Sequence, residues 1–296
     1  MDLNVVDENL LVRRAQSPNS ALPRGFLRWA GSKRAMLRHI VPFLPVKYRT
    51  YREPFLGSGA LFFLLQPERA ELSDTCAQLI ESFEGVRKNV SQVIRFLKPL
   101  KPDRNMFYQI RNNPSSGRIK RAAEFIYLNK TCWNGLYRVN GDGRFNVPFG
   151  RPRSDFIADF DNLRACSDAL QKSGIGIVCC DYQEALNEVV KEDLVYLDPP
   201  YVTRHNNNGF IDYNETLFSW DDQKRLAKRA CELAEGGAYV IVTNANHQEV
   251  LNLYKGFQRL VVTRNSTLAS NSKFRAPVEE AILYSPNCNG RKRSDL

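Results

Sequence analysis

The sequence places a carboxylate, two prolines and a tyrosine at the end of a short apolar run. Residues 194–197 are all apolar or aromatic and predict a buried strand, and Asp198, Pro199, Pro200 and Tyr201 follow directly. Each proline fixes its own φ and restricts the residue before it, so the end of the strand is stiff. Ligands of open α/β sheets bind outside the carboxyl ends of strands. This end therefore predicts a site with two fixed acceptors, the Asp198 carboxylate and the Pro199 carbonyl, beside an aromatic ring.

Two acceptors and a ring suit chemistry on an aromatic amine. The 6-amino group of adenine is a poor nucleophile because its lone pair is delocalised into the ring. Acceptors that bind both amino hydrogens localise the lone pair and stabilise the positive charge that develops, while Tyr201 can stack on the base. Each preorganised group of this kind contributes on the order of 10²–10³ in rate. The alternative is an ordinary turn in which Asp198 only ends the strand.

Glycines and an acidic residue earlier in the chain predict an adenosine-type ligand. Gly57 and Gly59 lie between an expected strand and an expected helix, where glycine lets the backbone approach a ligand closely. The next expected strand, 70–73, ends at Asp74, from which a carboxylate can accept hydrogen bonds from a ribose. The alternative role of Asp74 is to cap the following helix. The full dinucleotide fingerprint is absent, which argues against NAD.

Strands and helices that alternate along most of the chain must position these residues. The small-residue turn before Lys33 lies at the expected start of a helix and suits an anionic ligand. The strand 176–180 ends at Asp181 and Tyr182. Alternation of this kind predicts an α/β fold. The expected strands are 50–55, 70–73, 176–180, 194–197, 238–243, 257–264 and 278–284.

Composition narrows the class of protein. The chain has 296 residues, of which 43% are hydrophobic, as in ordinary globular proteins. Its formal net charge of +10 suggests a polyanion partner and also fits solubility alone. Its seven cysteines include no Cys-x-x-Cys pair, so we expect reduced thiols in a cytoplasmic protein, without a zinc site. No apolar run approaches the length of about 18 residues that predicts a membrane span.

Residues 101–153 interrupt the α/β alternation and are strongly basic. From Arg104 to Arg153 there are ten basic and two acidic residues, a formal charge of +8. The sequence is helix-like at first, and Asn140–Gly143 then predicts a hairpin turn. A basic hairpin that carries aromatic residues can enter a DNA groove and read base edges. Alternatively, the aromatic residues belong to the core and the arginines to a solvated face.

Seven motifs, in one order along the chain, resemble those of the Dam-type DNA adenine methyltransferases. The resemblance covers roughly residues 25–286. It implies a Rossmann-like sheet that binds S-adenosylmethionine, an inserted, mostly helical target-recognition domain that carries a β-hairpin, and double-stranded DNA containing GATC as the substrate. The motifs lie at residues 26–33, 55–59, 74, 134–138, 145–151, 198–201 and 270–275.

The resemblance also implies roles for individual residues. Asp198, Pro199 and Tyr201 would hold the target adenine. Within the DNA interface, Arg138 would read a guanine, while Leu136 and Pro148 would touch thymine. The cofactor would contact Trp29, Lys33, Phe55, Gly57, Gly59, Asp74, Asp181, Tyr182 and Asp198. The DNA would contact Arg28, Trp133, Asn134, Leu136, Arg138, Pro148, Arg151, Asn271 and Arg275.

Together these features predict a catalytic domain over 25–100 and 154–286 and a target-recognition domain over 101–153, with flexible tails at 1–24 and 287–296. We expect a monomer in the cytoplasm, associated with the nucleoid, that needs neither a metal nor a membrane. Two alternatives stay open on the sequence. One is a methyltransferase that acts on RNA or on a protein side-chain amide, and the other is a non-catalytic DNA-binding protein.

Overall fold

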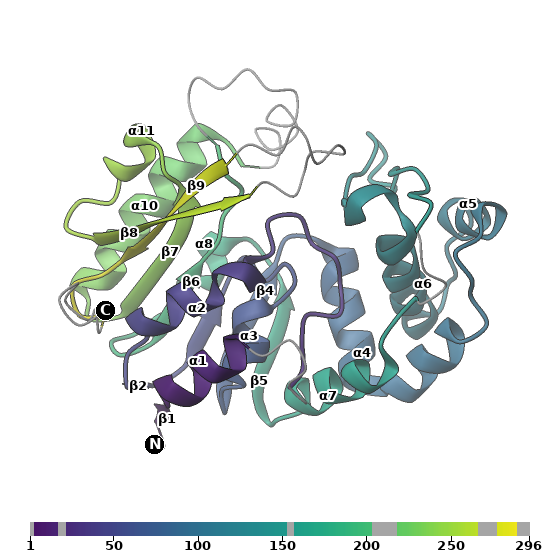
Figure 1. Cartoon of the computed structure of the whole chain (residues 1–296), viewed down its shortest axis with the longest axis horizontal. Coiled ribbons are helices and arrows are strands. Elements are labelled where there is room, and N and C mark those ends of the chain that lie inside the picture. The colour runs from purple at the N-terminus through teal and green to yellow at the C-terminus, as the bar shows by residue number, and fades with distance from the viewer. Residues whose placement is uncertain (1–2, 17–21, 153–156, 203–217, 266–276, 289–296) are drawn as a thin grey trace.

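Seven strands form the central sheet of the computed structural model, which describes residues 3–16, 22–152, 157–202, 218–265 and 277–288 (Figure 1). The strand order is β5-β4-β3-β6-β7-β9-β8, with the first five parallel and β9 antiparallel to both neighbours. This mostly parallel sheet confirms the predicted Rossmann-like α/β fold. The bounds are β3 (Tyr51–Glu53), β4 (Arg69–Asp74), β5 (Gly174–Cys179), β6 (Leu194–Leu197), β7 (Tyr239–Ala245), β8 (Gln258–Asn265) and β9 (Pro277–Tyr284).

The central strands are buried on both faces. All four residues of β6 are buried, and they alternate between two cores: Leu194 and Tyr196 contribute to one, Val195 and Leu197 to the other. Alternate side chains of a strand point to opposite faces, and a parallel sheet needs cover on both. The continuous apolar pattern of β6 is therefore that of a central strand with packed layers on each side.

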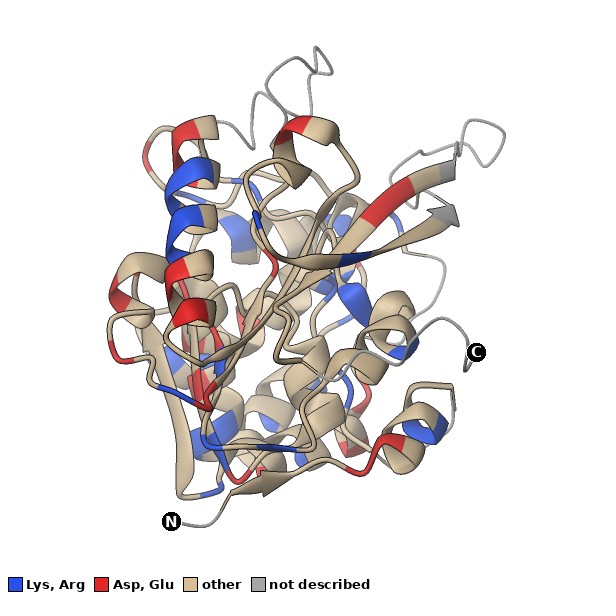
Figure 2. Ribbon diagram, turned by 90° about the vertical axis from the view of Figure 1, so that its left-hand side faces the viewer, with Lys and Arg blue, Asp and Glu red and all other residues tan. Residues whose placement is uncertain are grey.

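Helices supply those layers. Helix α10 lies between β6 and β7 in the chain. It begins with a capping box made by Ser219 and Asp222, which satisfies backbone N–H groups that would otherwise be unpaired. Figure 2 shows basic residues along the middle of its outer side and acidic residues toward both ends, and ion pairs join neighbouring turns. Among the described residues, none of the helices combines the length and apolar character that crossing a bilayer requires. The bounds are α2 (Leu37–Ile40), α3 (Ala60–Leu65), α4 (Ala77–Leu97), α7 (Phe160–Leu170), α8 (Tyr182–Ala185), α10 (Trp220–Glu235) and α11 (Gln248–Leu251).

The order of the strands reverses between β3 and β6. From β3 the chain moves outward through β4 to β5, and from β6 it moves in the opposite direction to β7. Crevices at such reversals, outside the carboxyl ends of the strands, are where open α/β sheets bind ligands. The 55–59 loop follows β3 and Asp198 follows β6, so the topology brings the two sequence-predicted sites to the same place.

The basic segment 101–153 packs onto the sheet domain through helix α4. It contains α5 (Arg104–Asn112), α6 (Arg118–Thr131) and a short helix η3 (Trp133–Gly135), and Figure 1 shows these at the opposite side of the molecule from β8. Helices α4 and α6 approach closely at Gly85, where an added Cβ would lie 2.4 Å from the Cβ of Ala122. Apolar residues of this segment and of the sheet domain belong to one continuous core.

The predicted flexible tail at 1–24 is wrong for the described part of that segment. Residues 4–5 form β1 (Asn4–Val5), which pairs with β2 (Lys47–Tyr48), and α1 (Glu8–Gln16) follows. The buried Asn4 side chain donates to the Arg49 carbonyl over 2.7 Å and accepts from the Glu68 amide over 2.7 Å. Leu11 adds a buried apolar anchor. At the other end, Asn287 donates to the Ala238 carbonyl (3.0 Å) and Cys288 is buried, so the second predicted tail does not begin at 287.

Candidate active site

Asp198 is held at the carboxyl end of β6 by two donors from distant parts of the chain. Its Oδ1 lies 2.8 Å from Nζ of Lys33 and accepts a 2.7 Å hydrogen bond from Oγ1 of Thr243. Within the described residues no donor bonds Oδ2, and 18% of the side chain is exposed. Asp198 therefore has one fixed oxygen and one oxygen available to a ligand.

The environment of Asp198 combines burial with opposing charges. Burial raises the pKa of Asp198 above its ordinary value of 3.8, and the nearby carboxylate of Glu280 adds to this effect. The charge of Lys33 and the hydrogen bonds from Lys33 and Thr243 lower the pKa of Asp198 and offset part of the rise. A carboxylate of raised pKa is a better acceptor for a group that becomes positively charged.

Tyr201 is fixed by a residue of β9, which lies beyond β7 in the sheet. Its hydroxyl donates to Oε2 of Glu280 over 2.8 Å, and Nζ of Lys33 lies 4.7 Å from the centre of its ring. Glu280 has no exposed side-chain surface and lies 3.9 Å from Nζ of Lys33. Burial and the neighbouring carboxylates raise the pKa of Tyr201 well above 10, so the phenol stays protonated and continues to donate. The structure thus brings Lys33, Asp198 and Tyr201 together.

The two prolines of the motif differ in how their carbonyls are used. Nε2 of the buried Gln223 donates to the Pro200 carbonyl over 3.0 Å, and Asn244 holds Gln223 by donating to its Oε1 over 3.1 Å. Within the described residues no hydrogen-bond donor contacts the Pro199 carbonyl. The Pro199 carbonyl, which was predicted as the second acceptor, is therefore available. Its direction is restricted because Gln223 holds the carbonyl of the next residue, Pro200.

The turn before Lys33 packs against the loop that follows β3. Nζ of Lys33 donates to the Gly31 carbonyl over 2.6 Å, and Gly31 has a φ of 81°, a conformation that favours glycine. Lys33 starts the short helix η1 (Lys33–Met36). The hydroxyls of Ser32 and Ser58 lie 2.8 Å apart, which ties this turn to the 55–59 loop.

The two glycines of the 55–59 loop have left-handed φ values of 47° at Gly57 and 63° at Gly59. A Cβ added at Gly57 would lie 2.8 Å from Cδ1 of Trp29, so this position tolerates only glycine without rearrangement. The Trp29 ring also stacks on Tyr137, with ring centroids 5.6 Å apart. Trp29 thus joins the predicted cofactor loop to the predicted DNA-recognition segment.

Asp74 connects this loop to β4. Its Oδ2 accepts from the Gly57 amide over 3.1 Å and its Oδ1 accepts from the Cys76 amide over 3.0 Å. Each carboxylate oxygen can accept more than one hydrogen bond, so these contacts leave capacity for a hydroxyl group. Burial raises the pKa of Asp74, and the backbone donors oppose the rise. Asp74 lies beside Gly57, and the N-cap position of α4 is occupied by Cys76, whose side chain makes no capping hydrogen bond.

Aromatic side chains form the next part of the same sheet edge. The rings of Phe55 and Tyr182 stack with centroids 5.5 Å apart, and Phe218 meets Phe55 edge-on at 5.7 Å. Tyr182 is buried and packs against Phe55 at the start of the 55–59 loop. Asp181 caps α8 by accepting from the Gln183 amide over 2.9 Å and is exposed.

Arg28 and the turn at 133–135, which are about 100 residues apart in the sequence, meet around Asn129. This side chain is 1% exposed; it accepts from the Arg28 amide (2.7 Å) and donates to the Arg28 carbonyl (2.6 Å). It also lies 3.5 Å from the Gly135 carbonyl. A Cβ at Gly135 would lie 2.4 Å from Cβ of Arg28, so glycine permits this close packing.

A turn and a hairpin present the remaining recognition residues. Asn134 and Gly135 have φ values of 53° and 64°, and the Trp133 amide donates to the Pro148 carbonyl over 2.9 Å. Val139 forms an antiparallel β-bridge with Phe145, and Cys132 forms another with Phe149. These bridges confirm the predicted hairpin, although they are isolated and do not extend into a longer ladder. Of the predicted DNA contacts, Arg28, Trp133, Asn134, Arg138, Pro148 and Arg151 are exposed and Leu136 is partly exposed, while Asn271 and Arg275 lie outside the described residues.

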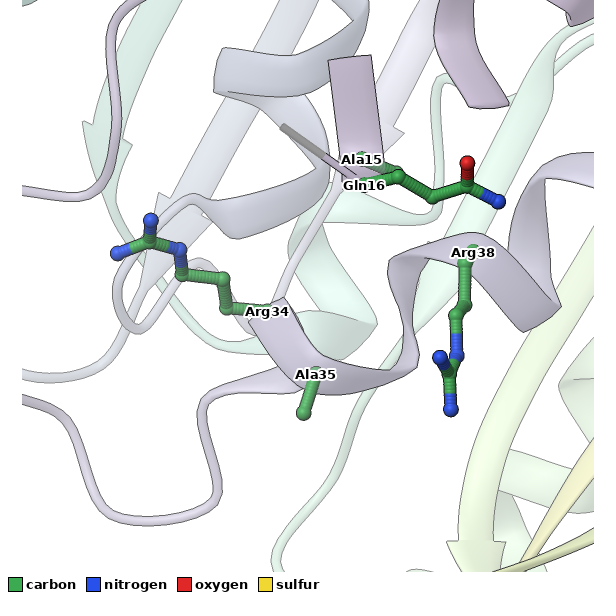
Figure 3. Close-up of a pocket in the computed structure, with 5 residues that line it drawn as sticks. All are labelled: Ala15, Gln16, Arg34, Ala35 and Arg38. Carbon is green, nitrogen blue, oxygen red and sulfur yellow. The ribbon is translucent and has the colours of Figure 1, made fainter. Parts of the chain in front are cut away.

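A cavity of about 430 Å³ lies apart from the predicted site residues (Figure 3). Arg34 and Arg38 project from the helical turns after Lys33, and Ala15 and Gln16 come from the end of α1. The cavity contains none of the residues predicted to hold the cofactor, the adenine or the DNA. We assign it no part in the chemistry.

Sequence reasoning missed the residues that hold the predicted ones. Thr243 bonds Asp198, Glu280 bonds Tyr201, Gln223 bonds the peptide after Pro200, and Asn129 bonds the backbone of Arg28. All four are polar and 0–1% exposed. A polar residue inside an otherwise apolar strand or helix was the available signal, because buried polar groups need partners.

Comparison with a family model and comparison with individual proteins agree with each other. Residues 29–268 match the family described as D12 class N6 adenine-specific DNA methyltransferase. The chain is 34% identical over 268 residues to "Type II methyltransferase M1.LlaDCHI" of Lactococcus lactis subsp. cremoris, covering 88% of this chain and 94% of that protein. It is 30% identical over 270 residues to "DNA adenine methylase" of Escherichia coli strain K12, covering 89% of this chain and 96% of that protein.

Proposed function

Because the chain belongs to the D12 class N6 adenine-specific DNA methyltransferase family, we propose that it transfers the methyl group of S-adenosylmethionine to adenine N6 in double-stranded DNA, within GATC. The observation that carries this proposal is the state of Asp198. One oxygen of its carboxylate is fixed by Lys33 and Thr243, and the other has no donor within the described residues. The choice of GATC rests on the resemblance of the recognition motifs.

The residues around the 55–59 loop fit an adenosine cofactor. Gly57 allows the backbone to approach a ligand, Asp74 has spare acceptor capacity for a ribose, and Phe55 offers an aromatic wall. Trp29, Lys33, Gly59, Asp181 and Tyr182 complete the set that would hold it. Bound S-adenosylmethionine supplies an electrophilic methyl group on a sulfonium centre.

The chain's own residues would activate the amine. The Asp198 Oδ2 and the Pro199 carbonyl accept its two hydrogens, which draws the lone pair out of the ring system. The ionised carboxylate stabilises the positive charge that develops on nitrogen. Tyr201, held by Glu280, supplies a stacking surface for the base. The proton that nitrogen sheds can pass to Asp198, whose raised pKa suits a proton acceptor.

The segment 101–153 would recognise the DNA. Extracting a base from the duplex costs a few kcal/mol, and groove and phosphate contacts offset that cost. The +8 charge of the window 104–153, the exposed Arg138 and the exposed Trp133 support such contacts. We assign 25–100 and 154–286 to catalysis and 101–153 to target recognition, in a monomeric cytoplasmic enzyme that works on the nucleoid.

A plasmid assay tests this function. The protein and S-adenosylmethionine are incubated with plasmid, which is then challenged with nucleases that differ in sensitivity to methylation at GATC. The plasmid should resist the nuclease that methylation at GATC blocks, and the other nucleases should still cut it. Asp198→Ala should abolish this resistance while binding of the protein to the duplex survives. Methylation of an RNA or a peptide amide in place of the duplex would contradict the proposed substrate, and an active Asp198→Ala protein would contradict the mechanism.

A further inference from the structure

Thr243 lies behind Asp198, with apolar residues beside it in the strand register and the buried polar residues Asn244 and Glu280 close by on β7 and β9. It is fully buried on β7, where its neighbours in the strand register are Ile282 of β9 and, one pair away, Leu283. Its hydroxyl has two described partners, Asp198 Oδ1 at 2.7 Å and the Tyr196 hydroxyl at 3.1 Å. A buried hydroxyl among apolar residues is unfavourable unless it is bonded, so both contacts matter for this position.

The direction of these two hydrogen bonds follows from the number of protons. Thr243 has one hydroxyl hydrogen, and an ionised Asp198 can only accept, so Thr243 donates to Asp198. The Tyr196 hydroxyl must then donate to Thr243. Tyr196 is buried, and its pKa is raised well above 10, so it keeps its proton. Tyr196, Thr243 and Asp198 form a chain with one donor direction, from the core of the sheet to the catalytic site.

Lys33 alone cannot set the orientation of the Asp198 carboxylate. Its ammonium group is a point charge on a flexible stem and also donates to the Gly31 carbonyl. Thr243 has a short, β-branched side chain with few rotamers and stands on a strand that is paired on both sides. Of the two donors, Thr243 is the one with a fixed direction.

We propose that Thr243, supported by Tyr196, is a positioning residue that sets the rotation of the Asp198 carboxylate so that Oδ2 meets the amine. Both donors to Asp198 use Oδ1, which leaves Oδ2 to the ligand within the described part of the site. This inference rests on the proposed role of Asp198. It adds a residue of β7 that acts through its hydrogen bond to Asp198.

Three substitutions separate positioning from a structural role. Thr243→Val keeps the shape and removes the hydroxyl, Thr243→Ser keeps the hydroxyl, and Tyr196→Phe removes the donor behind it. In single-turnover methyl transfer with saturating DNA and S-adenosylmethionine, Thr243→Val should be slower by about 10- to 100-fold, the range for a hydrogen bond to a charged group. Thr243→Ser should restore the rate to within about threefold, and Tyr196→Phe should lie between the two.

The pH dependence gives a readout that a loss of packing would not move. Removing the Thr243 donor takes stabilisation from the ionised form of Asp198, so its pKa rises and the acidic limb of the rate profile moves to higher pH, by about one unit. The other groups that face Asp198 are Lys33, Glu53, Tyr196, Tyr201 and Glu280, and Thr243→Val leaves all of them in place.

The outcomes are distinguishable. A slow Thr243→Val with a shifted acidic limb, rescued by Thr243→Ser, with unchanged affinity for DNA and cofactor, supports the inference. A wild-type rate and profile for Thr243→Val, with Asp198→Ala inactive, overturns the inference and leaves the proposed function intact. Equal losses in Thr243→Val and Thr243→Ser, accompanied by lower thermal stability, also overturn it, because the hydroxyl would then serve folding. An active Asp198→Ala overturns the proposed function itself.

Discussion

Nζ of Lys33 lies 2.8 Å from Oδ1 of Asp198. The sequence motifs assign Lys33 to the cofactor and Asp198 to the target amine. The ion pair joins these two predicted sites directly. Nζ of Lys33 also lies 3.9 Å from Oε2 of Glu280, so the buried ammonium group of Lys33 faces two carboxylates. The charge of the site, and with it the protonation of Asp198, depends on Lys33.

Lys33→Met should destabilise the protein in a pH-dependent manner. Removing one partner of a buried ion pair costs about 3–5 kcal/mol because the other charge stays buried. Lys33 lowers the pKa of Asp198, which burial raises above 3.8, so the variant raises that pKa further. The loss in the free energy of unfolding is complete at pH values above the pKa of Asp198 in the variant, where Asp198 is ionised in both proteins. It shrinks as the pH falls through that pKa and disappears below the pKa of Asp198 in the wild type, where both folded proteins hold the proton.

Urea unfolding over a pH series measures this loss. Lys88→Met is the matched control, since Lys88 is exposed and pairs with Glu84 on the surface of α4. Surface pairs contribute about 0–1 kcal/mol, so the control should change little at any pH. If Lys33→Met matched the control in stability across the series, the ion pair would have no energetic role.

Gly57→Ala should weaken binding of the cofactor. The new Cβ would lie 2.8 Å from Cδ1 of Trp29, at a φ of 47° that side chains rarely adopt, so the loop or the indole must move. We expect affinity for S-adenosylmethionine to fall by at least about tenfold, because strain of this kind costs on the order of 1–3 kcal/mol. Calorimetric titration measures it.

Gly141→Ala serves as the control for Gly57→Ala, because no atom lies within 4 Å of the added Cβ at the tip of the hairpin. Its cofactor affinity should equal that of the wild type. Equal affinities for both variants would exclude the 55–59 loop from the cofactor site.

Tyr201→Ala and Tyr201→Phe separate the ring from its hydroxyl. The alanine variant removes the stacking surface, which contributes roughly 1–3 kcal/mol per base. The phenylalanine variant keeps the ring and removes only the 2.8 Å hydrogen bond to Glu280. Methylation should therefore fall much further in Tyr201→Ala than in Tyr201→Phe, measured as single-turnover rates on one duplex. Equal losses would show that the hydroxyl, and not the ring, is the functional group.

The sequence located the centre of the site but not the residues that hold it. The apolar run 194–197 followed by Asp198 indicated a strand end, and Gly57 and Gly59 were visible as a turn between a strand and a helix. Glu280 was not foreseen because β9 comes last in the chain yet lies between β7 and β8, and periodicity does not give strand order. Thr243 was not foreseen because the sequence does not give the register between β6 and β7, which brings Thr243 beside Asp198. Both act through contacts between strands that the sequence keeps far apart.

The tail predictions failed for a related reason. A polar composition suggested that the first 24 residues were flexible, but Asn4 pairs with backbone groups near residues 49 and 68. Arg24 forms an ion pair with Asp159 at 3.1 Å. Such long-range partners satisfy polar residues that composition alone assigns to solvent.

Arg138→Lys tests base recognition by the hairpin. Arginine can bond guanine through two parallel donors, and lysine carries the same charge without that geometry. Nε of Arg138 donates to Asn146 over 2.7 Å, which leaves the terminal nitrogens of the guanidinium group for a base. The variant should lose about 1–3 kcal/mol of discrimination between GATC and a duplex with the guanine replaced, measured by competition binding. The salt dependence of binding should stay unchanged because the charge remains.

Arg144→Ala, on the same hairpin, is the control variant. It should weaken binding to both duplexes alike and reduce the salt slope. If Arg138→Lys also weakened both duplexes equally, Arg138 would contact the phosphate backbone and another residue would read the guanine.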